Sequence, residues 1–276
     1  MVPSPAAAGL LLVSAARDGR RPASFWRFAG SPPPGEGKTP VLAVAGLGLD
    51  GRVFSRLAPL SAERDLVLVN LPNDVARGSR MEDFAEEALG ALDAAGHAGR
   101  RAILLGSSFG GMVALAAALG HPERTAGLVL VGTGAGWETV TARLRLFSRF
   151  ERLVPRRVYP SVFTFVMLPP SRYPDPETRE GLRVQMLHRT KGFIGACVGA
   201  MRGFDATSRL GGIRTPSLVV HGDGDRVFAP RHGEAMARGI PGATLLRVPA
   251  CGHLPQVSHP GPTVEGLRRF LEGAGL

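Results

Sequence analysis

A serine stands between two glycines in the segment 101–119, which reads RAILLGSSFGGMVALAAAL. Residues 102–105 form the short apolar run of a buried strand, and Gly111–Leu119 has the small apolar residues of a buried helix. Gly106–Gly110 between them has the spacing G-x-S-x-G, in which a strand turns sharply into a helix and larger side chains would collide. We therefore expect Ser108 to project beside a helix N-terminus, where negative charge is favoured and its oxygen can act as a nucleophile.

A serine hydroxyl becomes an effective nucleophile only when a base removes its proton and a carboxylate orients that base. Two later segments supply both groups. A predicted strand at Ser217–His221 is followed by Asp225, and a second at Thr244–Val248 is followed by His253. Because the carboxyl ends of parallel strands meet at one edge of a sheet, we expect these side chains to meet Ser108 there. The order serine, acid, histidine is the one that accompanies this serine turn.

Each of these residues also has an ordinary interpretation. Ser108 could be a turn residue and helix N-cap, Asp225 a turn residue, and His253 a loop residue. Asp223 competes with Asp225 for the role of the acid. The three types in this order, each just past a strand, favour a catalytic triad in which His253 takes and returns the serine proton. No cluster of His, Cys, Asp and Glu has metal-ligand spacing, so we expect no metal.

Strands and helices alternate along most of the chain, which predicts an α/β fold with a mostly parallel central sheet and helices on both faces. From 133 to 210 this alternation stops, and prolines interrupt short helical segments. We therefore predict a core of residues 1–132 and 211–276 with an inserted helical cap at 133–210. The expected strands are 10–16, 23–29, 41–45, 65–70, 102–105, 127–131, 217–221 and 244–248, and the expected core helices are 52–60, 81–95, 111–119, 234–238 and 263–271.

The composition narrows the class of protein. The chain has 276 residues, 44% of them hydrophobic, and only Cys197 and Cys251 as cysteines, which excludes a disulfide scaffold and favours a reducing compartment. No run approaches about 20 apolar residues, so no membrane span is expected. Residues 6–16 lack the basic residues that precede a signal sequence, and we expect a cytoplasmic protein. The net charge is +10, but no nucleic-acid-binding motif accompanies it, so we expect no nucleic-acid partner.

Positive charge is concentrated in the predicted cap, where residues 133–210 hold thirteen Arg and Lys against six Asp and Glu. Helical spacing would place Arg145, Arg149 and Arg152 on one face. This face is either an ordinary solvated helix face or a surface that receives an acidic substrate or an acidic carrier domain.

The chain resembles the α/β-hydrolase superfamily over nearly its whole length, and four stretches carry the resemblance. They read VAGLGLDGRVF, LLGSSFGGMVALAAALGHPERTAGLVLVGT, VVHGDGDRVFAP and VPACGHLPQVSHP. The resemblance implies Ser108 as nucleophile, Asp225 as acid and His253 as base, and it implies no cofactor.

The resemblance also implies an oxyanion hole made by the backbone amides of Phe109 and Leu47, with Gly48 next in line. Gly46, Gly48 and Leu49 are the candidate substrate-binding residues, with an ordinary helix-entry residue as the alternative interpretation of Leu49. Many relatives have His-Gly where this chain has Ala45 and Gly46, but the change leaves the backbone amides in place.

Two further likenesses concern the substrate. The segment from Gly181 to Val220 resembles 3-oxoadipate enol-lactonase-like hydrolases, and Gly46–Leu49 resembles the esterase that cleaves pimeloyl-carrier-protein methyl ester. Both imply hydrolysis of a carboxylic ester or lactone through an acyl-enzyme on Ser108. The same triad in relatives also serves acyl transfer, thioester hydrolysis or carbon–carbon cleavage. A non-catalytic protein that binds a small ligand on the same fold is the remaining alternative.

Overall fold

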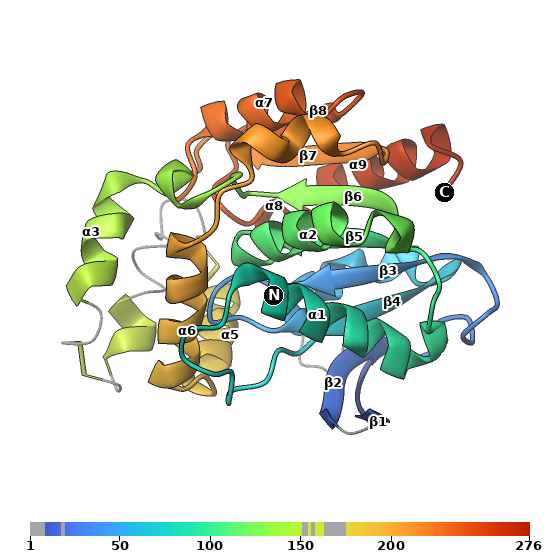
Figure 1. The fold of residues 1–276 in the computed structure, drawn as a ribbon, viewed down its shortest axis with the longest axis horizontal. Coiled ribbons are helices and arrows are strands. Elements are labelled where there is room, and N and C mark those ends of the chain that lie inside the picture. The colour runs from blue at the N-terminus through green and yellow to red at the C-terminus, as the bar shows by residue number, and fades with distance from the viewer. Residues whose placement is uncertain (1–8, 18–19, 151–153, 156–157, 163–174) are drawn as a thin grey trace.

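The computed structural model describes residues 9–17, 20–150, 154–155, 158–162 and 175–276. Its centre is an eight-stranded sheet in the order β1-β2-β4-β3-β5-β6-β7-β8 (Figure 1). All eight strands lie where the sequence predicted them, with ends that differ by at most three residues. They are β1 (Leu10–Arg17), β2 (Arg20–Phe28), β3 (Lys38–Val44), β4 (Arg64–Val69), β5 (Ala102–Ser107), β6 (Thr125–Val131), β7 (Ser217–Gly222) and β8 (Thr244–Val248).

The six strands β3 to β8 run parallel to one another. At one edge of the sheet, β1 pairs antiparallel with β2, and β2 pairs antiparallel with β4. Every residue of β4, β5 and β6 is buried, as the continuous apolar runs in their sequences require of a sheet covered on both faces. In the pairing register, Gly106 of β5 lies between Val44 of β3 and Leu130 of β6. The carboxyl ends of these three strands are therefore level, and the loops that follow them share one edge of the sheet.

Helices cover both faces of the sheet and confirm the predicted fold class. One face packs against α1 (Met81–Leu92), α2 (Phe109–Gly120) and α7 (Pro230–Gly239). The other packs against η1 (Gly51–Leu60), α8 (Pro255–Ser258) and α9 (Pro260–Gly273). Shorter 3-10 helices occur at η3 (Pro122–Arg124), η4 (Trp137–Thr139) and η6 (Thr207–Gly212).

Two predicted helices differ in type from the observed ones, and the helix predicted at 234–238 begins four residues earlier, at Pro230. The helix predicted at 52–60 is the 3-10 helix η1, which contains Pro59. The helix predicted at 81–95 ends as an α-helix at Leu92 and continues as a π-helical turn, η2 (Asp93–His97), in which Gly96 has a φ of 92°. The wider turn carries His97 into the interior, where its Nε2 lies 2.8 Å from Oδ2 of the buried Asp65.

Between β6 and β7 the chain forms α3 (Ala142–Phe150), α5 (Pro176–Leu187) and α6 (Lys191–Arg202). These helices lie beyond the end of the sheet to which the arrows of the parallel strands point (Figure 1). Helix α6 packs its apolar side onto α1 and α2, with Phe193 and Cys197 fully enclosed. The cap boundaries 133 and 210 stay a prediction.

Part of the predicted basic face is outside the described residues. Arg152 of this face lies there, and so do the nearby Arg156 and Arg157. Within the described part, Arg145 forms an ion pair with Glu138. No helix among the described residues is both long and apolar enough to cross a membrane.

Candidate active site

Ser108 occupies the turn between β5 and α2 in a backbone conformation that serine rarely adopts, with φ 56° and ψ −119°. The glycines on either side make the turn possible. A Cβ atom at Gly106 would lie 2.1 Å from the carbonyl oxygen of Gly110, and one at Gly110 would lie 2.0 Å from the carbonyl oxygen of Val44. The strand and helix therefore approach so closely that only glycine fits, and the turn presents Ser108 at the carboxyl edge of the sheet.

The structure brings the three predicted triad residues together. Nε2 of His253 lies 2.9 Å from Oγ of Ser108, and Nδ1 of His253 lies 3.0 Å from Oδ2 of Asp225. All three residues are at most 5% exposed. A histidine that donates Nδ1–H to the carboxylate keeps the lone pair of Nε2 free to accept the serine proton. The ring of Phe228 stacks on the ring of His253, with centroids 5.9 Å apart.

Asp225 is held in place by hydrogen bonds to both of its oxygens. Oδ1 accepts from the backbone amides of Val227 at 2.7 Å and Phe228 at 3.1 Å, so Oδ2 remains for His253. Burial by itself would raise the pKa of Asp225, but the neighbouring histidines outweigh it and hold that pKa well below its usual range. Asp223, the competing candidate, is exposed and bonds Arg247 instead.

A second histidine at the acid was not anticipated from the sequence. Nε2 of His221 lies 3.3 Å from Oδ2 of Asp225 and 2.9 Å from the carbonyl oxygen of Phe228. Burial opposes a positive charge on His221, but its hydrogen bond to Asp225 prevails and raises its pKa above the ordinary 6.5. Its position at the end of β7, four residues before Asp225, was the available signal, but this position alone does not say which way the ring points.

The two predicted oxyanion-hole amides belong to two different segments beside the serine. Phe109 is the first residue of α2, and Leu47 is in the loop after β3. Among the described residues, neither amide is hydrogen-bonded to a backbone carbonyl. A Cβ atom at Gly46 would lie 3.2 Å from Cβ and 3.7 Å from Oγ of Ser108, so this loop is in contact with the serine.

The loop 46–50, which we call the oxyanion loop, also touches the cap. Gly48 has a φ of 78°, and a Cβ atom there would lie 2.8 Å from Cε of Met186 and 3.4 Å from Cδ1 of Ile194. The carbonyl oxygen of Leu49 accepts a hydrogen bond from Arg189. From the sequence, Arg189 is only one of the cap's positive charges, because no local pattern connects it to a loop 140 residues earlier.

Comparisons with known proteins place this fold and site in a family. Residues 41–265 match the family described as the alpha/beta hydrolase family. The chain belongs to this family, as its sequence motifs predicted.

The proteins that the chain resembles differ in length and in the activity for which they are named. The chain is 30% identical to a pimeloyl-[acyl-carrier protein] methyl ester esterase of Chromobacterium violaceum, over 84% of this chain and 94% of the esterase. It is 31% identical to the polyketide synthase ThaQ of Burkholderia thailandensis, over 84% of this chain but only 12% of the synthase. A thermophilic esterase from Thermogutta terrifontis superposes with a TM-score of 0.78 at 27% identity, covering 96% of this chain and 99% of the esterase.

Proposed function

We propose that this protein is a serine hydrolase that cleaves a carboxylic ester or lactone through an acyl-enzyme on Ser108. The observation that carries the proposal is the continuous path from Oγ of Ser108 through both nitrogens of His253 to Oδ2 of Asp225, with contacts of 2.9 and 3.0 Å. Nucleophile, base and orienting acid are thus within hydrogen-bonding reach of one another before any substrate binds. The named esterases among the relatives support the same reaction class.

In the first half of the proposed reaction, Oγ of Ser108 attacks the carbonyl carbon while its proton passes to Nε2 of His253. The carbonyl oxygen becomes an oxyanion that the amides of Leu47 and Phe109 receive. The tetrahedral intermediate collapses as His253 gives the proton to the leaving alkoxide oxygen. The products are an ester of Ser108 and an alcohol, which stays attached to the acyl group if the substrate is a lactone.

The second half regenerates the enzyme. A water molecule gives a proton to His253 and attacks the acyl carbon, and the new intermediate expels Oγ of Ser108, which takes the proton back. The ionised Asp225 stabilises the imidazolium at each stage. A thiol leaving group would follow the same path as the alcohol, and an acceptor alcohol in place of water would give acyl transfer.

The test measures hydrolysis of p-nitrophenyl acetate, butyrate and octanoate by the wild type and by Ser108→Ala. We expect Ser108→Ala to lose at least about 10³-fold in kcat, because removal of a triad member leaves only the contribution of the oxyanion hole and binding. Ser107→Ala is the matched control, since Ser107 bonds Gln256 outside the triad, and it should stay within about tenfold of the wild type. Wild-type activity in Ser108→Ala would contradict the proposal.

A second candidate is hydrolysis of an acyl group attached to a carrier protein. It is favoured by the surplus of positive charge at 133–210, and the relative from Chromobacterium violaceum is named for a carrier-bound ester. To test this candidate, kcat/KM is measured for the methyl ester of a carrier-bound acid and for the same methyl ester without the carrier. If the carrier is recognised, kcat/KM is higher for the bound ester, and about 0.5 M salt removes the advantage by screening. Equal values at low salt would exclude this candidate.

A further inference from the structure

The end of cap helix α5 holds the oxyanion loop from outside. Gln185 lies in the last turn of α5, Arg189 lies two residues past the end of that helix, and both side chains are buried. Oε1 of Gln185 accepts a hydrogen bond from the amide of Asp50 at 3.2 Å. Nη2 of Arg189 donates to the carbonyl oxygen of Leu49 at 2.9 Å. Both the C=O and the N–H of the single peptide group that joins Leu49 to Asp50 are therefore bonded to the cap.

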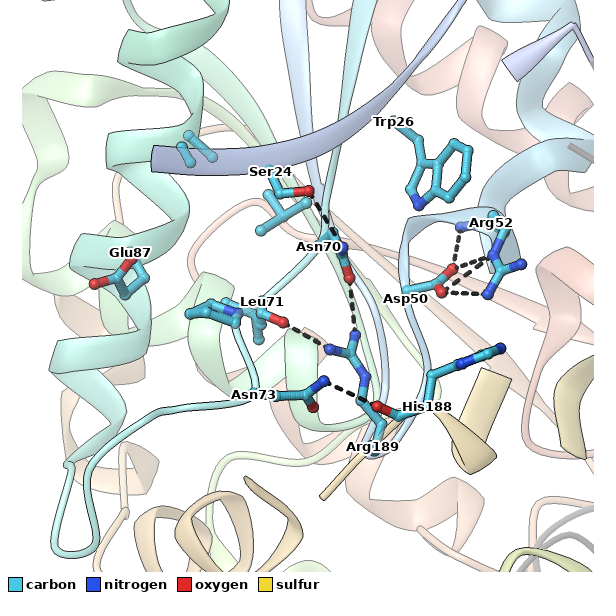
Figure 2. A pocket seen from close by; sticks show the side chains of 14 residues that line it. Ser24, Trp26, Asp50, Arg52, Asn70, Leu71, Asn73, Glu87, His188 and Arg189 are labelled. Atoms are coloured by element: carbon cyan, nitrogen blue, oxygen red, sulfur yellow. Dashed lines mark hydrogen bonds and ion pairs between the residues drawn. The ribbon is translucent and has the colours of Figure 1, made fainter. Parts of the chain in front are cut away.

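Arg189 joins this loop to the next one at the same edge of the sheet. Its Nη1 donates to the carbonyl oxygen of Leu71 at 2.6 Å, and its Nη2 also reaches Oδ1 of Asn70 at 3.2 Å. Figure 2 shows the guanidinium group pointing between these two residues, beside a pocket of about 260 Å³. The guanidinium group also lies over the ring of Phe193, with Cζ 4.7 Å from the ring centroid. Its orientation is thus fixed both by hydrogen bonds and by this ring contact.

The hydrogen-bond acceptors of this guanidinium are all neutral. Arg189 is only 8% exposed, and burial lowers the pKa of Arg189, with the charge of Asp50 acting in the opposite direction. A buried cation is costly unless its N–H groups are well bonded. A planar group with several donors satisfies two loops at once, which an apolar side chain cannot do and which the compact ammonium of a lysine does not match in geometry.

The oxyanion loop has Ser108 on its inner side and the cap on its outer side. Gly46 touches Ser108, and Gly48 touches Met186, so the amide of Leu47 lies between these two contacts. The carbonyl held by Arg189 is only two residues further along the chain. Oxyanion stabilisation requires donors about 2.7–3.1 Å from the developing charge, and a misplacement of about 1 Å can cost roughly 10² in rate. Release of the Leu49 carbonyl would therefore displace the amide of Leu47.

We propose that Arg189, supported by Gln185, is a positioning residue for the oxyanion hole: it fixes the amide of Leu47 by holding the carbonyl of Leu49. The inference rests on the proposed function, because it gives that amide a role in the reaction. It also makes the cap part of the catalytic apparatus, since the geometry of the oxyanion hole depends on a side chain from the cap. Arg189 touches no reacting atom and acts through the loop alone.

The test compares Arg189→Met with Arg183→Met, a control on the preceding helix α5 whose side chain is paired with Glu180 at the surface. The acylation rate constant is measured by stopped flow with a p-nitrophenyl ester and expressed per active site by titration. We expect Arg189→Met to lower the acylation rate and kcat about 10- to 100-fold with KM within about threefold. Arg189→Lys should fall between it and the wild type, and Arg183→Met should stay within about twofold.

A second variant keeps the test decisive if Arg189→Met does not fold. Gln185→Leu removes the acceptor for the amide of Asp50 and leaves Arg189 in place, and we expect it to lower the acylation rate about 3- to 10-fold. The rate of inactivation by an aryl phosphonate, whose adduct is tetrahedral, should fall in parallel in each variant. A side chain with a purely structural role would lower the melting temperature but leave the acylation rate per titrated site unchanged.

The outcomes separate this inference from the proposed function. If the wild type forms no acyl-enzyme, the proposed function fails and the inference fails with it. If the wild type is acylated, and the variant that folds is acylated equally fast per titrated site, only the positioning role is overturned. A lower acylation rate constant per titrated site in both variants, with KM within about threefold of the wild type, supports the positioning role.

Discussion

His221 and His253 approach the same carboxylate oxygen of Asp225, with nitrogen–oxygen distances of 3.3 and 3.0 Å. The candidate acid is therefore shared by two imidazoles, of which only His253 also reaches the serine. The two rings keep the carboxylate ionised although it is buried, because their attraction outweighs the cost of burial. His221 also bonds the carbonyl of Phe228, so it ties the loop that carries the acid back onto β7.

Replacement of His221 by glutamine should change how stability depends on pH. The pKa of His221 is raised in the folded state, so the stabilisation it gives is fully present below its unfolded pKa, near 6.5, and is lost as the pH rises through the higher folded value. Melting temperatures of the wild type and His221→Gln are measured from pH 5.5 to 9. The wild-type advantage should be largest at the acid end and shrink as the pH rises. A difference that stays constant over this range would exclude the linkage.

The choice of Asp225 over Asp223 as the acid predicts a contrast between two matched substitutions. Asp225→Asn should fold but lose about 10³- to 10⁴-fold in kcat, because an amide no longer holds the required tautomer of His253. Asp223→Asn removes only an exposed ion pair with Arg247 and should change kcat less than about twofold. Both values come from ester hydrolysis at neutral pH. A larger loss for Asp223→Asn than for Asp225→Asn would reverse the assignment.

The serine turn predicts a contrast between two glycines of α2. Gly110→Ala would place a methyl group 2.0 Å from a backbone oxygen of β3, and we expect a loss of more than about 3 kcal/mol of unfolding free energy, or no folded protein. Gly120→Ala meets no atom within 4 Å, and we expect a change of at most about 1 kcal/mol, in the stabilising direction. Denaturant unfolding followed by circular dichroism gives both values. Equal stabilities of the two variants would mean that the close approach at Gly110 is not rigid.

The parts of the fold that the sequence predicts best are those set by local patterns. The apolar run at Thr244–Val248 is a strand with these same ends. The order of strands, turns and helices then brings Ser108, Asp225 and His253 to one edge, because parallel strands end together. Helix ends were harder to place, since the π-helical turn Asp93–His97 depends on the buried contact between His97 and Asp65.

The residues that sequence reasoning missed act through contacts far apart in the chain. Arg189 bonds a carbonyl 140 residues away, and its partners are backbone atoms that any residue could supply. His221 stands within a strand pattern that would accept an apolar residue equally well. Neither has a spacing that indicates its partner, so both become visible only when the loops at the sheet edge are placed in space.

The most direct test of the account is to identify the acylated atom. Wild-type protein is mixed rapidly with excess p-nitrophenyl ester, quenched in acid and digested, and the acyl group is located by mass spectrometry. We predict a burst of about one p-nitrophenolate per active site and an acyl group on Ser108, with neither in Ser108→Ala. A burst with the acyl group on another residue, or steady hydrolysis of the same ester by folded Ser108→Ala, would contradict the claim that Ser108 is the nucleophile.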